Sequence, residues 1–146
     1  MLKIVRTYDG VFPSSIDNVG VAVRDILGSL VNIFGPLLDC TLFELTVILN
    51  EIVINAIKHG NKGDLKKLVK ISSVATEDGY VCFIVEDEGC GYDYNCKCSN
   101  GLRIPCAEDI CDIQESGRGM IIVRNLCDCV KVNNKGNKIV VLKKLR

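Results

Sequence analysis

Hydrophobic and polar residues alternate with two different periods along the chain, which predicts a protein built of both helices and strands. Apolar residues recur every three to four positions over residues 14–34 and 41–59, and this spacing is typical of amphipathic helices. Alternating or continuous apolar runs at 2–8, 66–76 and 80–87 predict strands. The first two-thirds of the chain should therefore supply two long helices and three strands.

Residues at the predicted helix ends support these boundaries. Ser14 or Ser15 precedes the first helix and is suited to cap its N-terminus. Thr41 and Glu44 have the spacing of a capping box at the start of the second helix. Gly60 stands where a C-terminal cap is expected.

The last third of the chain is less regular. Residues 88–116 show little periodicity, residues 120–128 predict a short helix, and residues 130–144 predict a hairpin with Gly136 and Asn137 near its turn. We find no repeat, low-complexity tract or linker, so we expect one domain spanning residues 1–146.

Composition narrows the classes of function. The 18 basic residues balance the 18 acidic residues, so no net positive charge attracts nucleic acid or an anionic membrane. No apolar stretch approaches the roughly 20 residues that cross a bilayer, and the N-terminus does not resemble a signal peptide. We therefore expect a cytoplasmic protein, in which the nine cysteines are reduced thiols or metal ligands.

The second predicted helix carries the first group of candidate functional residues. Glu51, Asn55 and His59 are spaced by four residues, with Lys58 beside the last, so they share one face of the helix. Such a stripe is often a solvated surface. Asparagine is a poor helix former, however, and an amide beside a carboxylate is well suited to bind a metal ion.

Asp87 ends a predicted strand and is followed by Gly89 and Gly91. This pattern either forms a tight turn or places a carboxylate where the backbone can approach a flat ligand. Gly117 and Gly119 flank Arg118 at the start of the last predicted helix. Bare backbone N–H groups at a helix N-terminus bind phosphate, although a G-x-G pair alone is also a common loop hinge.

The order of these motifs resembles the GHKL superfamily. The segments "NEIVINAIKHGN", "VEDEGCGYDY" and "ESGRGMIIVRNLCDCVKV" look like its N, G1 and G2 boxes, and are most similar to those of bacterial anti-sigma-factor serine kinases. The resemblance implies the Bergerat ATP-binding fold. That fold is an α/β (α+β) two-layer sandwich, with a mixed, mainly antiparallel sheet and helices on one face.

The resemblance also implies a role for each matching residue. Asn55 would hold Mg²⁺, Asp87 would bind the exocyclic amine of adenine, and Glu51 would be the general base. The other matching residues would contact ATP: Lys58, His59, Gly89, Gly91, Gly117, Arg118 and Gly119. A glutamate at position 51 favours a hydroxyl acceptor, because sensor histidine kinases have asparagine there and phosphorylate an imidazole.

The resemblance implies two partners, an anti-anti-sigma (STAS-like) protein that is phosphorylated on serine and a sigma factor that is sequestered. A homodimer is also compatible with the sequence. The alternative is a regulatory module that binds nucleotide without kinase activity.

Residues 88–117 would form the lid over ATP, and here the chain departs from its relatives. Five cysteines lie in or beside this segment: Cys90, Cys96, Cys98, Cys106 and Cys111. They could bind zinc or an iron–sulfur cluster, or make the lid a redox sensor, although their spacing lacks the C-x₂-C pairs of common sites. The other interpretation is a set of reduced thiols with no ligand.

Overall fold

The computed structural model describes residues 3–89 and 119–145. Its described elements follow the sequence in the order β1 (Ile4–Pro13), η1 (Ile16–Asn18), α1 (Val19–Phe34), α2 (Asp39–Asn55), η2 (Ala56–Gly60), β2 (Leu68–Thr76), β3 (Tyr80–Asp87), β4 (Cys129–Val132) and β5 (Lys138–Lys144). Residues 119–126 are also helical. The two long helices, the three early strands and the closing hairpin are confirmed.

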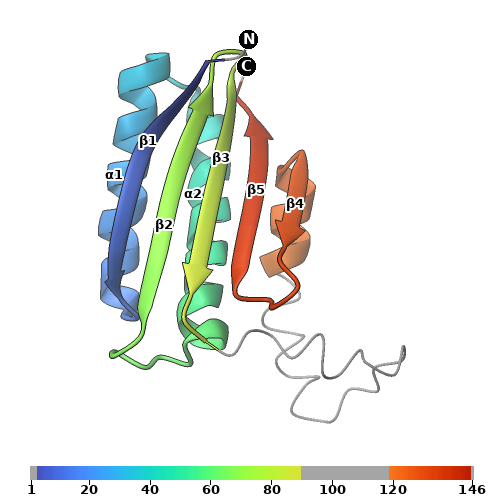
Figure 1. The fold of residues 1–146 in the computed structure, drawn as a ribbon. Coiled ribbons are helices and arrows are strands. Elements are labelled where there is room, and N and C mark those ends of the chain that lie inside the picture. The colour runs from blue at the N-terminus through green and yellow to red at the C-terminus, as the bar shows by residue number, and fades with distance from the viewer. Residues whose placement is uncertain (1–2, 90–118, 146) are drawn as a thin grey trace.

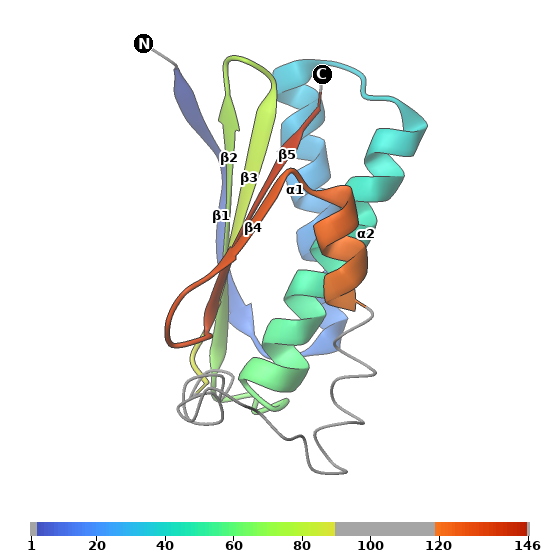
Figure 2. The same cartoon turned by 90° about the vertical axis from the view of Figure 1, so that its right-hand side faces the viewer.

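The strands form one sheet in the order β1-β2-β3-β5-β4, and every pair of neighbours in it is antiparallel. Helices α1, α2 and 119–126 all lie on the same face of this sheet (Figures 1 and 2). The two-layer sandwich with helices on one face is therefore confirmed. Among the described strand pairs the sheet is purely antiparallel, so the prediction of a mainly antiparallel sheet holds throughout this part of the chain.

Helix α2 supplies the centre of the core. Its inward side chains are fully or almost fully buried: Leu45, Ile48, Leu49, Ile52 and Val53. They pack with the inward side chains of β2 and β3, of which Ile71, Phe83 and Val85 are also buried. Removal of this apolar surface from water is the main stabilising contribution to the fold.

The helical run Asp39–Gly60 is, by length and composition alone, able to cross a membrane. The sequence pattern did not predict a helical run of this length, because its 22 residues combine helix α2 with the π-helical turn η2. The core helix of a globular domain has the same composition, and the buried residues of α2 described above account for its apolar character.

Helix starts follow the sequence only in part. Ser15 caps η1 as expected, since its hydroxyl accepts a hydrogen bond from the Asp17 N–H at 3.3 Å. The capping box at Thr41 and Glu44 is wrong. The Leu42 N–H already donates to the Leu38 carbonyl at 3.0 Å, so the helical ladder begins before Thr41 and leaves it inside the first turn.

Glu44 instead pairs with strand β5. Its carboxylate lies 2.9 Å from the Lys143 ammonium, which also donates to the Leu126 carbonyl at 2.7 Å. Leu126 is the last residue of helix 119–126, where a cation stabilises the unpaired carbonyl groups. Lys143 therefore joins α2, β5 and the C-terminal end of helix 119–126.

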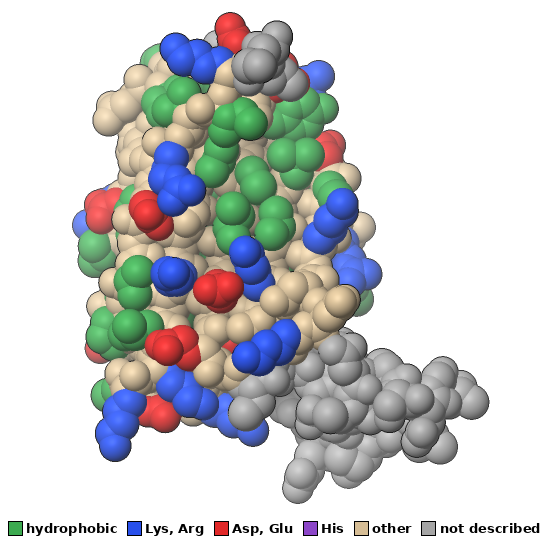
Figure 3. Space-filling model, viewed as in Figure 1, with side chains coloured by type: hydrophobic (Ala, Val, Ile, Leu, Met, Phe, Trp, Pro, Cys, Tyr) green, Lys and Arg blue, Asp and Glu red, His purple; other side chains and the backbone are tan. Residues whose placement is uncertain are grey.

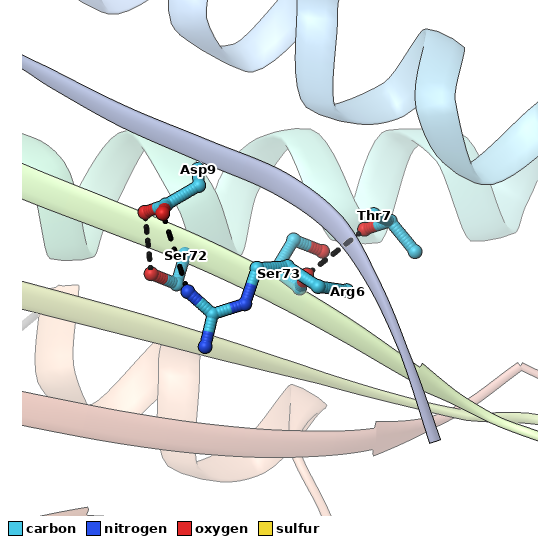
Figure 4. A network of polar contacts seen from close by, with 5 residues as sticks. All are labelled: Arg6, Thr7, Asp9, Ser72 and Ser73. Carbon is cyan, nitrogen blue, oxygen red and sulfur yellow. Dashed lines mark hydrogen bonds and ion pairs between the residues drawn. The ribbon is translucent and has the colours of Figure 1, made fainter. Parts of the chain in front are cut away.

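Strand β1 continues well beyond the predicted range 2–8, and its register with β2 shifts between Arg6 and Tyr8. In this bulge the Thr7 hydroxyl donates to the Ser73 carbonyl at 3.2 Å (Figure 4). Arg6 also reaches Asp9 at 3.2 Å on the exposed surface. A bulge on an edge strand disrupts pairing with other chains.

No described helix covers the other face of the sheet. The centre of that face is apolar, and basic and acidic side chains lie around it (Figure 3). The strand register places five partly exposed side chains in this apolar area: Val74, Cys82, Ile84, Val140 and Leu142. We call it the open-face patch.

Candidate nucleotide site

Helix α2 ends in a wide turn. The Asn61 N–H donates to the Ala56 carbonyl, five residues back, at 2.8 Å, so η2 is a π-helical turn. Glu51 and Asn55 lie on the same face of α2, whereas the residues after Asn55 no longer follow α-helical spacing. His59 in this turn is half-buried and Lys58 is exposed.

Gly60 is not a left-handed C-terminal cap, so that prediction is wrong. The positive φ angles that follow the helix belong to Lys62, at 54°, and Gly63, at 71°. Gly60 is instead the last residue of the π turn and is buried. The end of the helix packs against the end of β3, as the next contacts show.

Asp87 is the last residue of β3, and only 7% of it is exposed. The Gly89 N–H donates to its Oδ1 at 2.9 Å. Burial raises the pKa of Asp87 above its usual value, and the hydrogen bond from Gly89 and the charges of Lys67 and Lys135 offset only part of that rise. A buried carboxylate beside a bare backbone is suited to bind a polar group of a ligand.

Two glycines allow the helix end and the strand end to meet. A Cβ atom on Gly60 would overlap the carboxylate of Asp87. A Cβ atom on Gly89 would overlap the carbonyl oxygen of Gly60. A side chain at position 60 would thus displace the Asp87 carboxylate, and a side chain at position 89 would displace the backbone of Gly60. Gly60 was not recognised as a site residue, because a glycine after a helix usually indicates a cap.

Gly119 brings the third motif to the same helix. It is buried, and a Cβ atom on it would overlap the carboxylate of Glu51. Asn55 follows Glu51 by one helical turn, a rise of about 6 Å. The half-buried Asn55 side chain makes no capping hydrogen bond to the turn that follows. Glu51 thus contacts Gly119 and, further along the same helical run, Gly60 contacts Asp87. Asn55 lies between these two contacts.

Several predicted site residues lie outside the described residues. These are Gly91, Gly117 and Arg118, the cysteines Cys90, Cys96, Cys98, Cys106 and Cys111, and nearly all of the lid at 88–117. Residues 3–89 and 119–145 contain no group of three or more His, Cys, Asp or Glu side chains that could hold a metal ion. The lid metal site therefore stays a prediction.

Four described cysteines are free thiols: Cys40, Cys82, Cys127 and Cys129. Burial raises the pKa of Cys127 to about 11 and also raises that of Cys82. A thiol with a raised pKa forms little thiolate at neutral pH. Cys82 and Cys127 are therefore poor candidates for redox chemistry.

Comparison with known proteins is consistent with this arrangement. The sequence profile of the family described as "Histidine kinase-like ATPase domain" matches residues 10–143. The chain belongs to the histidine kinase-like ATPase family. Its resemblance to the GHKL superfamily is thus confirmed.

Similar proteins from several bacteria are named anti-sigma F factor. The one from Geobacillus thermodenitrificans is 38% identical over 116 residues, 76% of each chain. The one from Clostridium perfringens strain SM101 is 34% identical over 121 residues, 79% of this chain and 83% of the relative. The one from Priestia megaterium is 31% identical over 111 residues, 76% and 72% of the two chains.

A solved structure shares the fold. The histidine kinase domain from the Erythrobacter litoralis EL346 blue-light activated histidine kinase superposes with a TM-score of 0.50 at 18% identity. The alignment covers 87% of this chain and 61% of that chain. At this identity the likeness concerns the fold alone.

Proposed function

We propose that this protein is an ATP- and Mg²⁺-dependent serine-protein kinase that phosphorylates an anti-anti-sigma protein and sequesters a sigma factor. Membership of an ATPase family and the names of the relatives support both parts of this proposal. The observation that carries it is the convergence on one continuous helical run, where Gly119 meets Glu51 on α2 and Asp87 meets Gly60 on η2. One helix then holds the two ends of a nucleotide site.

Asp87 binds the base in this proposal. An ionised carboxylate accepts a hydrogen bond from the exocyclic amine of adenine. Gly60 and Gly89 support this role, because without side chains they let the helix end and the strand end pack directly around the carboxylate. Gly91, which lies outside the described residues, would also contact ATP, as the resemblance implies.

Asn55 holds Mg²⁺. Mg²⁺ prefers oxygen ligands and usually binds one or two protein groups together with phosphate oxygens and water. The amide oxygen of Asn55 fits this requirement, because it is half-buried and makes no cap to η2. The bound ion would neutralise charge on the phosphates. Lys58, His59, Gly117, Arg118 and Gly119 would contact those phosphates.

Glu51 acts as the general base. Its carboxylate accepts the proton of a serine hydroxyl while that oxygen attacks the γ-phosphorus, and the bond to ADP breaks. Gly119 lies directly against this carboxylate, so the phosphate-binding backbone and the base are adjacent.

Radiolabelled ATP and the candidate anti-anti-sigma protein test the transfer. We expect label on serine of the partner, and we expect Glu51→Gln to lower the rate by about 100-fold or more while ATP still binds. Glu77→Gln is the matched control, because Glu77 lies in the turn between β2 and β3, at the end of β3 opposite Asp87. Binding of ATP and partner without transfer would instead indicate a nucleotide-dependent binding module.

Two further parts of the proposal concern the protein in the cell. We propose that it is cytoplasmic and that neither nucleic acid nor a membrane is its partner. Cell fractionation would show whether the protein is found in the soluble fraction. Self-association into a homodimer is measured by sedimentation of the purified chain.

A further inference from the structure

The peptide bond after Asp87 is held from both sides by asparagine side chains. Asn61 Oδ1 accepts from the Glu88 N–H at 2.8 Å. Asn137 Nδ2 donates to the Asp87 carbonyl at 3.2 Å. The Asp87 N–H also donates to the Asn137 carbonyl at 2.8 Å. Both polar groups of this peptide bond are thus paired just where β3 ends.

Asn61 replaces a missing strand partner. The pairing of β2 with β3 ends at Val69 opposite Asp87, so the Glu88 N–H has no strand carbonyl to bond. The Asn61 side-chain amide supplies the acceptor, and its Nδ2 donates to the Leu68 carbonyl at 3.0 Å. A primary amide can do this because it carries the same donor and acceptor as a peptide group.

Asn61 is itself held rigidly. Only 1% of it is exposed, and its Nδ2 also donates to the Ser14 hydroxyl at 2.6 Å. That hydroxyl donates to the Lys67 carbonyl at 2.8 Å. The ends of β1 and η2 and the start of β2 are therefore tied to the end of β3 through one buried side chain.

We infer that Asn61, with Asn137 opposite it, is a positioning residue that orients the Asp87 carboxylate toward the base of the nucleotide. Clamping the peptide bond after Asp87 fixes the ψ angle of that residue and thereby the direction of its side chain. This inference rests on the proposed function, in which Asp87 binds adenine. Neither asparagine needs to touch the nucleotide.

The test compares ATP with inosine triphosphate, which has an oxygen in place of the exocyclic amine. Wild-type protein should prefer ATP by about 100-fold or more, because a site that accepts from an N–H rejects an analogue lacking it. Asn61→Ala should reduce this ratio by about tenfold or more, chiefly through weaker ATP binding. Asn137→Ala should reduce the ratio less, and Asn137 lies in the turn between β4 and β5, outside the buried core, so we expect this variant to fold.

Ile26→Val is the matched control, since it loosens the core on α1 far from the clamp. If the role of Asn61 were merely structural, Asn61→Ala would weaken the binding of both nucleotides equally. The preference for ATP over inosine triphosphate would then be unchanged, as in the control. If wild-type protein discriminates and neither asparagine variant alters the ratio, the inference is overturned while the proposed function stands. If wild-type protein binds neither nucleotide, or both equally, the proposed role of Asp87 itself fails.

Discussion

Gly119→Ala tests whether the contact between helix 119–126 and Glu51 serves catalysis or merely packing. The new methyl group would overlap Oε2 of Glu51 and lie 2.9 Å from its Cδ. These atoms are at the end of a flexible side chain, which can rotate away without moving the backbone. Gly119 has no positive φ angle, so alanine fits its backbone conformation.

The two expected effects have opposite signs. Replacing glycine by alanine in a helix stabilises it by about 1 kcal/mol, so the variant should be as stable as wild type or slightly more stable. Displacing Glu51 removes the general base, and such a group typically contributes a factor of about 100 to 10,000 in rate. The substitution should therefore preserve folding and abolish most phosphoryl transfer.

The assay combines urea unfolding, equilibrium binding of ATP and single-turnover transfer to the partner. Gly20→Ala is the matched control, because Gly20 lies in the first turn of α1 and a Cβ atom there meets nothing within 4 Å. The Gly20→Ala variant should gain similar stability and transfer the phosphoryl group at the wild-type rate. Normal transfer by Gly119→Ala would refute the assignment of Glu51 as the base.

Three further perturbations follow from the site. Gly89→Ala forces the backbone of Gly60 to move, and we expect urea unfolding to show a loss of about 1–3 kcal/mol; unchanged stability would mean that this contact is loose. The raised pKa of Asp87 means that the folded protein binds the proton more tightly than the unfolded chain, whose value is about 3.9. The resulting stabilisation is present below that pH and is lost as pH rises through the folded pKa, so the stability of Asp87→Asn relative to wild type should increase with pH. A difference that does not vary with pH would contradict the burial of an ionisable Asp87. Asn55→Ala should abolish the Mg²⁺ dependence of ATP binding measured by calorimetry, and a persisting dependence would exclude Asn55 as the ligand.

Local sequence patterns predicted the helices and strands well, because each pattern depends on residues that are close together in the sequence. The alternation in 66–76 and 80–87 follows from one buried and one open face of the sheet, and β2 and β3 occupy nearly the same residues. Gly136, with a φ of 79°, lies in the predicted hairpin turn. The order of the three motifs pointed to the family.

The errors arose where distant parts of the chain decide local structure. Thr41 and Glu44 have a capping pattern, but α2 begins at Asp39 and Glu44 bonds to β5 instead. Gly60 resembles a cap, whereas the contact that requires glycine is with Asp87, 27 residues later. No sequence pattern marked Asn61 as a site residue, because its hydrogen-bond partners Ser14, Leu68 and Glu88 come together only when the strands pair.

Lys143 fixes the C-terminal end of helix 119–126. Its hydrogen bond to Leu126 and its ion pair with Glu44 anchor that end to the sheet and to α2. At the other end of the described helix, Gly119 lies directly against the carboxylate of Glu51. Two side chains that have no proposed role in binding ATP, Glu44 and Lys143, thereby help to place Gly119 beside the proposed base.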